Sequence, residues 1–479
     1  MLSRQWVVGG MIWLGGVLFV LGCGPAAAPV PSPSPTVPLA AVEVVAHRGL
    51  TGTASCSGRA CHGGLHPAVQ PQMENRFLFN EHTVWLAVDR HANAYRTLFN
   101  ERSRRIARLL DPEGPPAHQN SRCLACHVNP LVAGAEPSTF DQHERLAGVG
   151  CEACHGGAEN WLVAHTTTAW ESLSIQEKRQ QGMFPINDMT VQAQVCAGCH
   201  VGAGPQEDGQ VPARDVNHDL IAAGHPRLNF EFAAYRANLP THWHETALAR
   251  TRPAYFDAQA WAIGQVVSAQ AALELLAYRA AEGPELFKPW PEFAEYDCFA
   301  CHHDLRQPSP RQERGYGKYL PGSLPWNDWY YAMPLTMAHL RLPGMPNDLN
   351  TLNDLAGTMR QPLPNRNMVR EQAEQAQEQL VSWLRYWQEP MSYDPSTMTK
   401  LRAGLTRMAS EEQPHAAPSW DAAAQLYLAL FALDHMKPEP ETQTLIQSLV
   451  KRLRFPIAHA DGQVILYDSP SHQPPTDRK

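Results

Sequence analysis

Apolar positions with helical spacing are concentrated in the second half of the chain. Residues 258–279 place their apolar side chains on one broad face, which predicts a long amphipathic helix. Residues 369–387 repeat apolar positions at intervals of three and four, and a further helix is expected after Ser419, a favourable N-cap. Before these helices the apolar pattern is sparse, although one helix is expected over residues 81–110. The pattern predicts a mostly α-helical, loop-rich protein.

The N-terminus has the pattern of an export signal. Arg4 supplies a positive charge, and the apolar stretch 6–21 is shorter than the roughly 20 residues that cross a bilayer as a helix. The stretch ends in Val-Leu-Gly-Cys, which resembles a bacterial lipoprotein cleavage box with Cys23 as the lipidated residue. A plain signal anchor is the alternative. We therefore expect a signal peptide at 1–23 and a Pro/Ala-rich tether at 24–45, in a membrane-anchored protein facing the periplasm or the cell exterior.

Ten of the eleven cysteines lie in pairs that a histidine follows directly. Four segments share the string Cys-x-x-Cys-His, in which two thiols add to the vinyl groups of one haem and the histidine ligates its iron. The cysteine pairs are Cys123 and Cys126, Cys151 and Cys154, Cys196 and Cys199, and Cys298 and Cys301, followed by His127, His155, His200 and His302. Zinc sites and disulfides also use paired cysteines, but they do not need a histidine after each pair. The string predicts covalent haem c.

The remaining pair, Cys56 and Cys61, is followed by His62 and has a loop two residues longer. A small disulfide loop beside a histidine is the alternative. Haem attachment is favoured because ten cysteines then account for five haems with no thiol left over.

Each low-spin haem iron needs a second axial ligand, usually His or Met. The histidines preferred for this role are His91, His165, His218, His225 and His118, with His242 and His82 as further candidates and His143, His244 and His303 as weaker ones. His82 and His91 face opposite sides of the helix expected over 81–110, so one of them, preferably His91, serves the first haem. His218 and His225 are seven residues apart and share one face if their segment is helical.

The text around these motifs resembles multihaem cytochromes of the cytochrome c-554 type. The resemblance rests on Asp-x-His-Ala-x-Ala-Tyr at 89–95, Gly-Val-Gly-Cys-Glu-Ala-Cys-His-Gly at 148–156 and Asp-Val-Asn-His-Asp-Leu-Ile-Ala-Ala-Gly-His-Pro-Arg-Leu at 215–228. It runs from about Ser55 to His303. It implies a helical body wrapped round stacked haems, electron transfer outside the cytoplasmic membrane, and His91, His165, His218 and His225 as the better distal ligands. The fifth motif and the haem-free tail depart from the four-haem family pattern.

These observations predict a pentahaem cytochrome domain at 46–345 and an all-α, haem-free domain at 346–479. The expected function is electron transfer between redox partner proteins, with docking to a membrane complex through the C-terminal domain as a further role. The alternative is an oxidoreductase that acts on a small nitrogen or sulfur compound at an open haem iron. No catalytic residue is assigned. Lysines and arginines are scattered without a basic stripe, so no nucleic-acid partner is expected, and the net charge of −8 predicts faster electron exchange with basic partners at low salt.

Overall fold

The computed structural model describes most of the chain after residue 48. The described residues are 49–65, 78–134, 139–206, 210–243, 252–281, 289–302, 323–410, 419–453, 455–458 and 464–467. They are mostly α-helical, as expected from the sequence. The signal peptide, Cys23 and the tether lie outside the described residues, as do His244 and His303, so their roles stay predictions.

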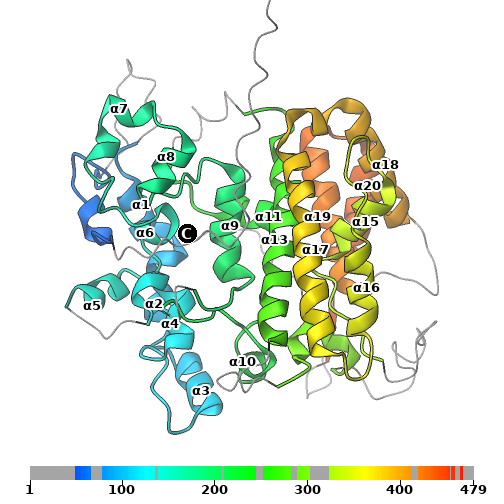
Figure 1. Cartoon of the computed structure of the whole chain (residues 1–479), viewed down its shortest axis with the longest axis horizontal. Helices are drawn as coiled ribbons and strands as arrows, with labels where there is room; N and C mark the ends of the chain where they lie inside the picture. The colour runs from blue at the N-terminus through cyan, green and yellow to red at the C-terminus, as the bar shows by residue number, and fades with distance from the viewer. Residues whose placement is uncertain are drawn as a thin grey trace, which may run out of the picture. The chain divides into compact units, whose positions relative to one another are not determined.

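Short helices and 3-10 turns carry the first four Cys-His motifs (Figure 1). The helices are α1 (Glu81–Val88), α2 (Ala94–Thr97), α3 (Glu101–Leu110), α4 (Ser121–His127), α5 (Thr139–Leu146), α6 (Cys151–His155), α7 (Thr168–Glu171), α8 (Ile175–Gln180), α9 (Met189–His200), α10 (His218–Ala222) and α11 (Phe232–Asn238). The 3-10 turns are η1 (Thr53–Cys56), η2 (Arg90–Asn93), η3 (Pro130–Val132), η4 (Ala164–Thr166), η6 (Phe293–Glu295), η7 (Cys298–Ala300) and η8 (Pro390–Tyr393).

The continuous helix expected over 81–110 is wrong, because capping residues divide it. The Asp89 carboxylate accepts a hydrogen bond from His91 N at 2.9 Å and starts η2. Asn100 Oδ1 accepts one from Ser103 N at 2.8 Å and starts α3. Short polar side chains that bond to the backbone ahead of them compete with helix continuation.

Long helices form the rest of the described fold. They are α13 (Phe256–Ala280), α15 (Ala332–Leu340), α16 (Asn350–Met359), α17 (Arg366–Gln388), α18 (Pro395–Ser410), α19 (Trp420–Met436) and α20 (Pro440–Arg452). The helices predicted over 258–279 and 369–387 are confirmed as α13 and α17. The N-cap at Ser419 is confirmed too, since its hydroxyl accepts a hydrogen bond from Ala422 N at 3.0 Å.

Helix α13 is the centre of this packing. It lies against α17 most extensively and also contacts α9, α11 and α19, and Figure 1 shows α13 beside α17. Among the described helices α13 is the one long and apolar enough to cross a membrane, but 83% of its most apolar window is buried, as in the core helix of a soluble domain. Helices from both sides of the expected boundary at 345/346 thus pack on α13, and that boundary stays a prediction.

Two short strands near the C-terminus were not part of the all-α expectation. Strand β1 (Phe455–Ala458) pairs antiparallel with β2 (Val464–Tyr467), with Phe455 opposite Tyr467.

Candidate haem-binding sites

The helix of the third Cys-His motif ends immediately after its histidine. Helix α6 spans Cys151–His155, and Gly156 follows with a φ of +81°. A Cβ at Gly156 would lie 2.0 Å from the carbonyl oxygen of Gly182, so glycine is required at this turn. Helices α4 and α9 likewise end at the histidines of the second and fourth motifs.

The described cysteines provide no support for the disulfide or zinc alternatives. The ten motif cysteines all have free thiols. Within the described ranges, no three His, Cys, Asp or Glu side chains converge so that they could hold a metal ion among themselves. Structural zinc sites need four such ligands.

Three motif histidines have a second histidine ring at nearly the same distance. The ring centres are 6.2 Å apart for His62 and His165, 6.0 Å for His91 and His200, and 6.4 Å for His218 and His302. Two imidazoles that bind one metal ion through Nε2, with metal–nitrogen bonds of about 2 Å, have ring centres roughly 6 Å apart. Each gap therefore matches the space that one six-coordinate iron needs.

The other two motif histidines also have a histidine neighbour. Burial lowers the pKa of His225, and the positive charge of His127 lowers it further. Burial lowers the pKa of His155 to about 4, with His242 as the largest charge contribution. Charge interactions thus connect His225 with His127 and His242 with His155, whereas the other three motif histidines have a second histidine ring centre 6.0–6.4 Å away.

Backbone carbonyls fix the ring orientation of several of these histidines. His127 Nδ1 lies 2.9 Å from the carbonyl oxygen of Ala94, and His165 Nδ1 lies 3.2 Å from that of Trp161. His225 Nδ1 lies 2.8 Å from the carbonyl oxygen of Pro226, and His242 Nδ1 lies 3.4 Å from that of Pro240. Because a carbonyl oxygen only accepts, each Nδ1 donates a proton and the Nε2 lone pair stays free for a metal.

Two further histidines are bonded to carboxylates. His62 Nδ1 lies 2.9 Å from Glu81 Oε2, and His91 Nδ1 lies 2.9 Å from the buried Asp89 Oδ1. These hydrogen bonds raise the pKa of both histidines. A carboxylate on the outer nitrogen makes an imidazole a stronger donor to the metal on its inner nitrogen.

Burial prepares the remaining donors for iron. It lowers the pKa of His200 to about 4, as it does for His155, so both rings are neutral at physiological pH. A metal binds neutral imidazole. The paired thiols, the facing rings and the free Nε2 atoms therefore fit covalently attached haem.

Two buried glutamates that the sequence analysis missed join the first motif to the third. Glu152, inside the third motif, accepts hydrogen bonds from Thr51 N at 2.9 Å and Gly52 N at 2.7 Å. Glu144 accepts bonds from the backbone and hydroxyl of Thr53, both at 2.8 Å. The sequence held a signal for Glu152, because it is an acidic residue between two haem-binding cysteines. A carboxylate buried at such a position needs hydrogen-bond partners.

Among the described residues, the rings of His82, His118 and His143 make no contact with the ring of a motif histidine. The His118 ring stacks on Phe99 at 4.3 Å and does not face a motif histidine. His82 packs on Trp85 at 5.5 Å; burial and the nearby charge of His62 lower its pKa. His143 is exposed. His91, preferred for the first haem, lies beside His200 of the fourth motif, and His165 is the residue that faces His62.

Thiols of different motifs are neighbours. The thiols of Cys56 and Cys151 shift each other's pKa, which is lowered at Cys56 and raised at Cys151, and those of Cys199 and Cys126 do the same, with Cys199 lowered and Cys126 raised. The charges of Cys196 and Cys199 raise the pKa of the Cys154 thiol, after burial as the main cause. The attachment points of the first four motifs are therefore close together.

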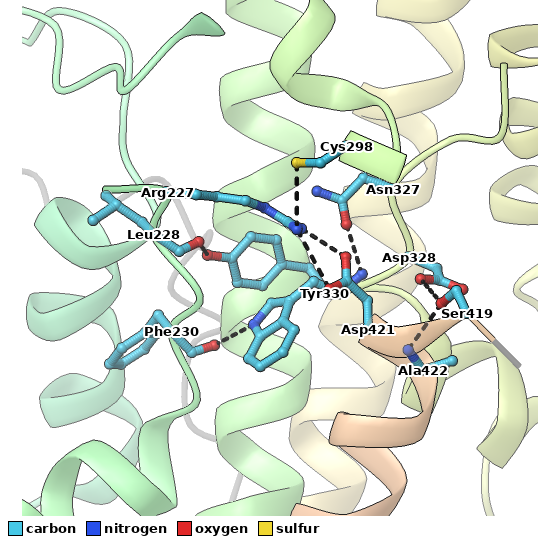
Figure 2. Close-up of polar contacts among 11 residues, drawn as sticks. Arg227, Leu228, Phe230, Cys298, Asn327, Asp328, Tyr330, Ser419, Asp421 and Ala422 are labelled. Atoms are coloured by element: carbon cyan, nitrogen blue, oxygen red, sulfur yellow. Dashed lines mark hydrogen bonds and ion pairs between the residues drawn. The ribbon is translucent and has the colours of Figure 1, made fainter. Parts of the chain in front are cut away.

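The fifth motif is joined to the long helices through Arg227. Figure 2 shows its guanidinium between Cys298 and Asp421 of α19: Nη1 lies 4.0 Å from Cys298 Sγ, and Nη2 lies 2.7 Å from Asp421 Oδ2. Beside it, Tyr330 Oη donates to Leu228 O at 3.0 Å. The chain that follows His225 is thus fixed to α19.

The motifs on this helical scaffold define a multihaem c-type cytochrome. Residues 72–156 match the family model described as cytochrome c554 and c-prime, so this part of the chain is a domain of that family. The match covers the second and third motifs and His91. No curated protein and no solved structure matches the chain. The protein is accordingly an electron-transfer cytochrome with covalently bound haem c, a class that is generally exported.

Proposed function

We propose that the chain holds five haems, each with its iron between two histidines, and passes electrons along them between redox partner proteins. The observation that supports this most strongly is that three motif histidines have a second histidine whose ring centre lies 6.0, 6.2 or 6.4 Å away. The proposed pairs are His62 with His165, His127 with His225, His155 with His242, His200 with His91, and His302 with His218. His242 takes the place that we had expected for His118.

The contacts between motifs support one order of haems. The haems are numbered by motif. The interaction of Cys56 with Cys151 supports a position of haem 1 next to haem 3. The interaction of Cys154 with Cys196 and Cys199 supports a position of haem 3 next to haem 4. The mutual pKa shifts of Cys199 and Cys126 support a position of haem 4 next to haem 2. Haem 5 follows haem 2, since Arg227, two residues after His225, reaches Cys298. The proposed path is 1–3–4–2–5.

The bound haems supply one-electron chemistry, and the polypeptide holds and tunes them. Glu81 and Asp89 hold the rings of His62 and His91 in position and increase their donor strength. Burial of His155 and His200 would keep water away from an iron held by either ring.

The alternative, catalysis on a small nitrogen or sulfur compound, requires an iron with an open position. The three histidine pairs with ring centres 6.0–6.4 Å apart do not favour an open position at the irons proposed there. We further propose that the protein is lipid-anchored at Cys23 and faces the periplasm or the cell exterior, which the N-terminal pattern supports. We also propose that residues 346–479 dock to a membrane complex.

A reductive titration of the purified protein, with haem content measured alongside, tests the proposal. It should take up five electrons per chain. His242→Ala should then convert one low-spin haem to high spin, whereas the matched control His118→Ala should leave all haems low-spin. Four electrons per chain, or the opposite behaviour of the two variants, would contradict the assignment.

A further inference from the structure

Arginines are concentrated in the segment 90–122, although lysines and arginines are scattered over the chain as a whole. Seven arginines lie here, and all seven are exposed: Arg90, Arg96, Arg102, Arg104, Arg105, Arg108 and Arg122. The acidic residues of the segment are Glu101, Asp111 and Glu113, which leaves an excess of four positive charges in a chain of net charge −8.

Helix α3 presents the densest part of this arginine surface. It buries Ile106 and Ala107, so the opposite side of the helix, with Arg104, Arg105 and Arg108, faces solvent. Among the described residues, no ion pair neutralises any of these three side chains. Their charges therefore act on the solution rather than on the fold.

Exposed apolar side chains lie among the arginines. Phe99 is 40% exposed and stacks on His118, and Leu109 is 58% exposed. Aromatic and aliphatic groups surrounded by arginines are typical of protein interfaces.

The arginine surface lies beside ligands of two of the proposed haems. The Arg102 guanidinium donates to the carbonyl oxygen of Gly224 at 2.6 Å, directly before His225. Arg122 Nη2 lies 3.5 Å from Asn217 Oδ1, directly before His218. A partner bound here would approach haems 2 and 5, at one end of the proposed path.

We propose that the arginine surface docks a redox protein with a carboxylate-rich face. This inference rests on the proposed electron-transfer function. The net charge predicts long-range attraction of basic partners, but docking follows the local field, which is positive here. An acidic partner is therefore bound at this end of the path.

The test measures stopped-flow reduction of the oxidised, haem-loaded protein by reduced flavodoxin, an acidic redox protein. The variant Arg104→Gln/Arg105→Gln/Arg108→Gln removes three charges from the surface. Arg385→Gln/Arg407→Gln/Lys451→Gln removes three exposed charges from α17, α18 and α20 as the matched control. At low salt the first variant should be slower than the natural protein by about tenfold and the control by less than about twofold, and high salt should abolish the difference.

Two further variants guard against a folding defect. Arg104→Lys/Arg105→Lys/Arg108→Lys keeps the charge and should keep the rate, and Glu101→Gln should accelerate reduction at low salt. Equal effects of the Gln variant and its control, or a rate of the natural protein that is independent of salt, would overturn the docking inference. Failure of dithionite to reduce the haems would instead refute the proposed function.

Discussion

The part of the chain that carries the first four motifs and the long helices around α13 have different interiors. In the motif region, residues 49–243, the buried apolar clusters are small, and one consists of only Ile106, Leu220 and Ala223. Around α13, whole tryptophans such as Trp261 and Trp383 are completely buried. One region is built from short helices that present histidines and thiols, and the other from long helices that present apolar faces.

The difference indicates where the folding free energy of each region comes from. Apolar burial stabilises the long helices directly. The motif region has only small buried apolar clusters, so we expect the attached cofactors to supply much of its core. Its stability should therefore depend on haem, and that of the long helices should not.

The largest expected effect is that of producing the full chain without haem attachment. Residues 49–243 should then be cleaved at least roughly tenfold faster than in the haem-loaded protein, because locally opened states are populated. The long helices around α13 should be cleaved at the same rate with and without haem. Limited proteolysis with mass spectrometry of the fragments checks this, and uniform cleavage or uniform protection would remove the distinction.

Leu380→Ala should lower the stability of the long helices around α13 without changing haem binding in the motif region. Leu380 is completely buried in α17, and its truncation should cost about 2–5 kcal/mol of unfolding free energy. Calorimetry and the haem absorption spectrum should show a lower melting temperature with unchanged haem bands. The control Leu363→Ala, at a position 76% exposed, should change stability by less than about 0.5 kcal/mol.

Asp328 gives the long-helix region a pH dependence. Burial raises the pKa of its carboxyl to about 6, with Ser419 as hydrogen-bond donor at 2.6 Å. The folded state therefore disfavours the charged form, and stability should fall as the pH rises from about 4 to about 6. Asp328→Asn should remove this fall and stabilise the protein at pH 7 by roughly 1–3 kcal/mol. If the melting temperatures of the natural protein and of Asp328→Asn depend on pH in the same way, the role of Asp328 is contradicted.

Substitution of Arg227, which connects the fifth motif to helix α19, should have a smaller effect. The positive charge of Arg227 near Cys298 would favour the reduced, less positive iron of the haem proposed at the fifth motif. Arg227→Gln should lower the potential of one haem by several tens of millivolts, and Asp421→Asn should raise it. Spectroelectrochemistry would refute the connection if neither variant shifted a potential, or if all five haems shifted together.

The sequence predicted the parts of the site that depend on local spacing. The Cys-His strings and the helices at 258–279 and 369–387 are of this kind. The pairing of distal histidines depends on tertiary contacts. Asp89 and Asn100 divide the expected helix, which places His91 beside His200.

Backbone turns explain the case of His218 and His225. Their spacing suggested one helical face, but α10 ends at Ala222, and Gly224 follows with a φ of +115°. The two histidines therefore face different motifs. His242 carried no local signal, because its neighbour His155 is far away in the sequence.

Electron paramagnetic resonance of the oxidised protein, with haem content by pyridine haemochrome, tests the central claim most directly. We expect five haems per chain, all low-spin, because the proposed function places a histidine on each side of every iron. A high-spin signal that responds to nitrite, hydroxylamine or nitric oxide, or a content of four haems, would contradict it.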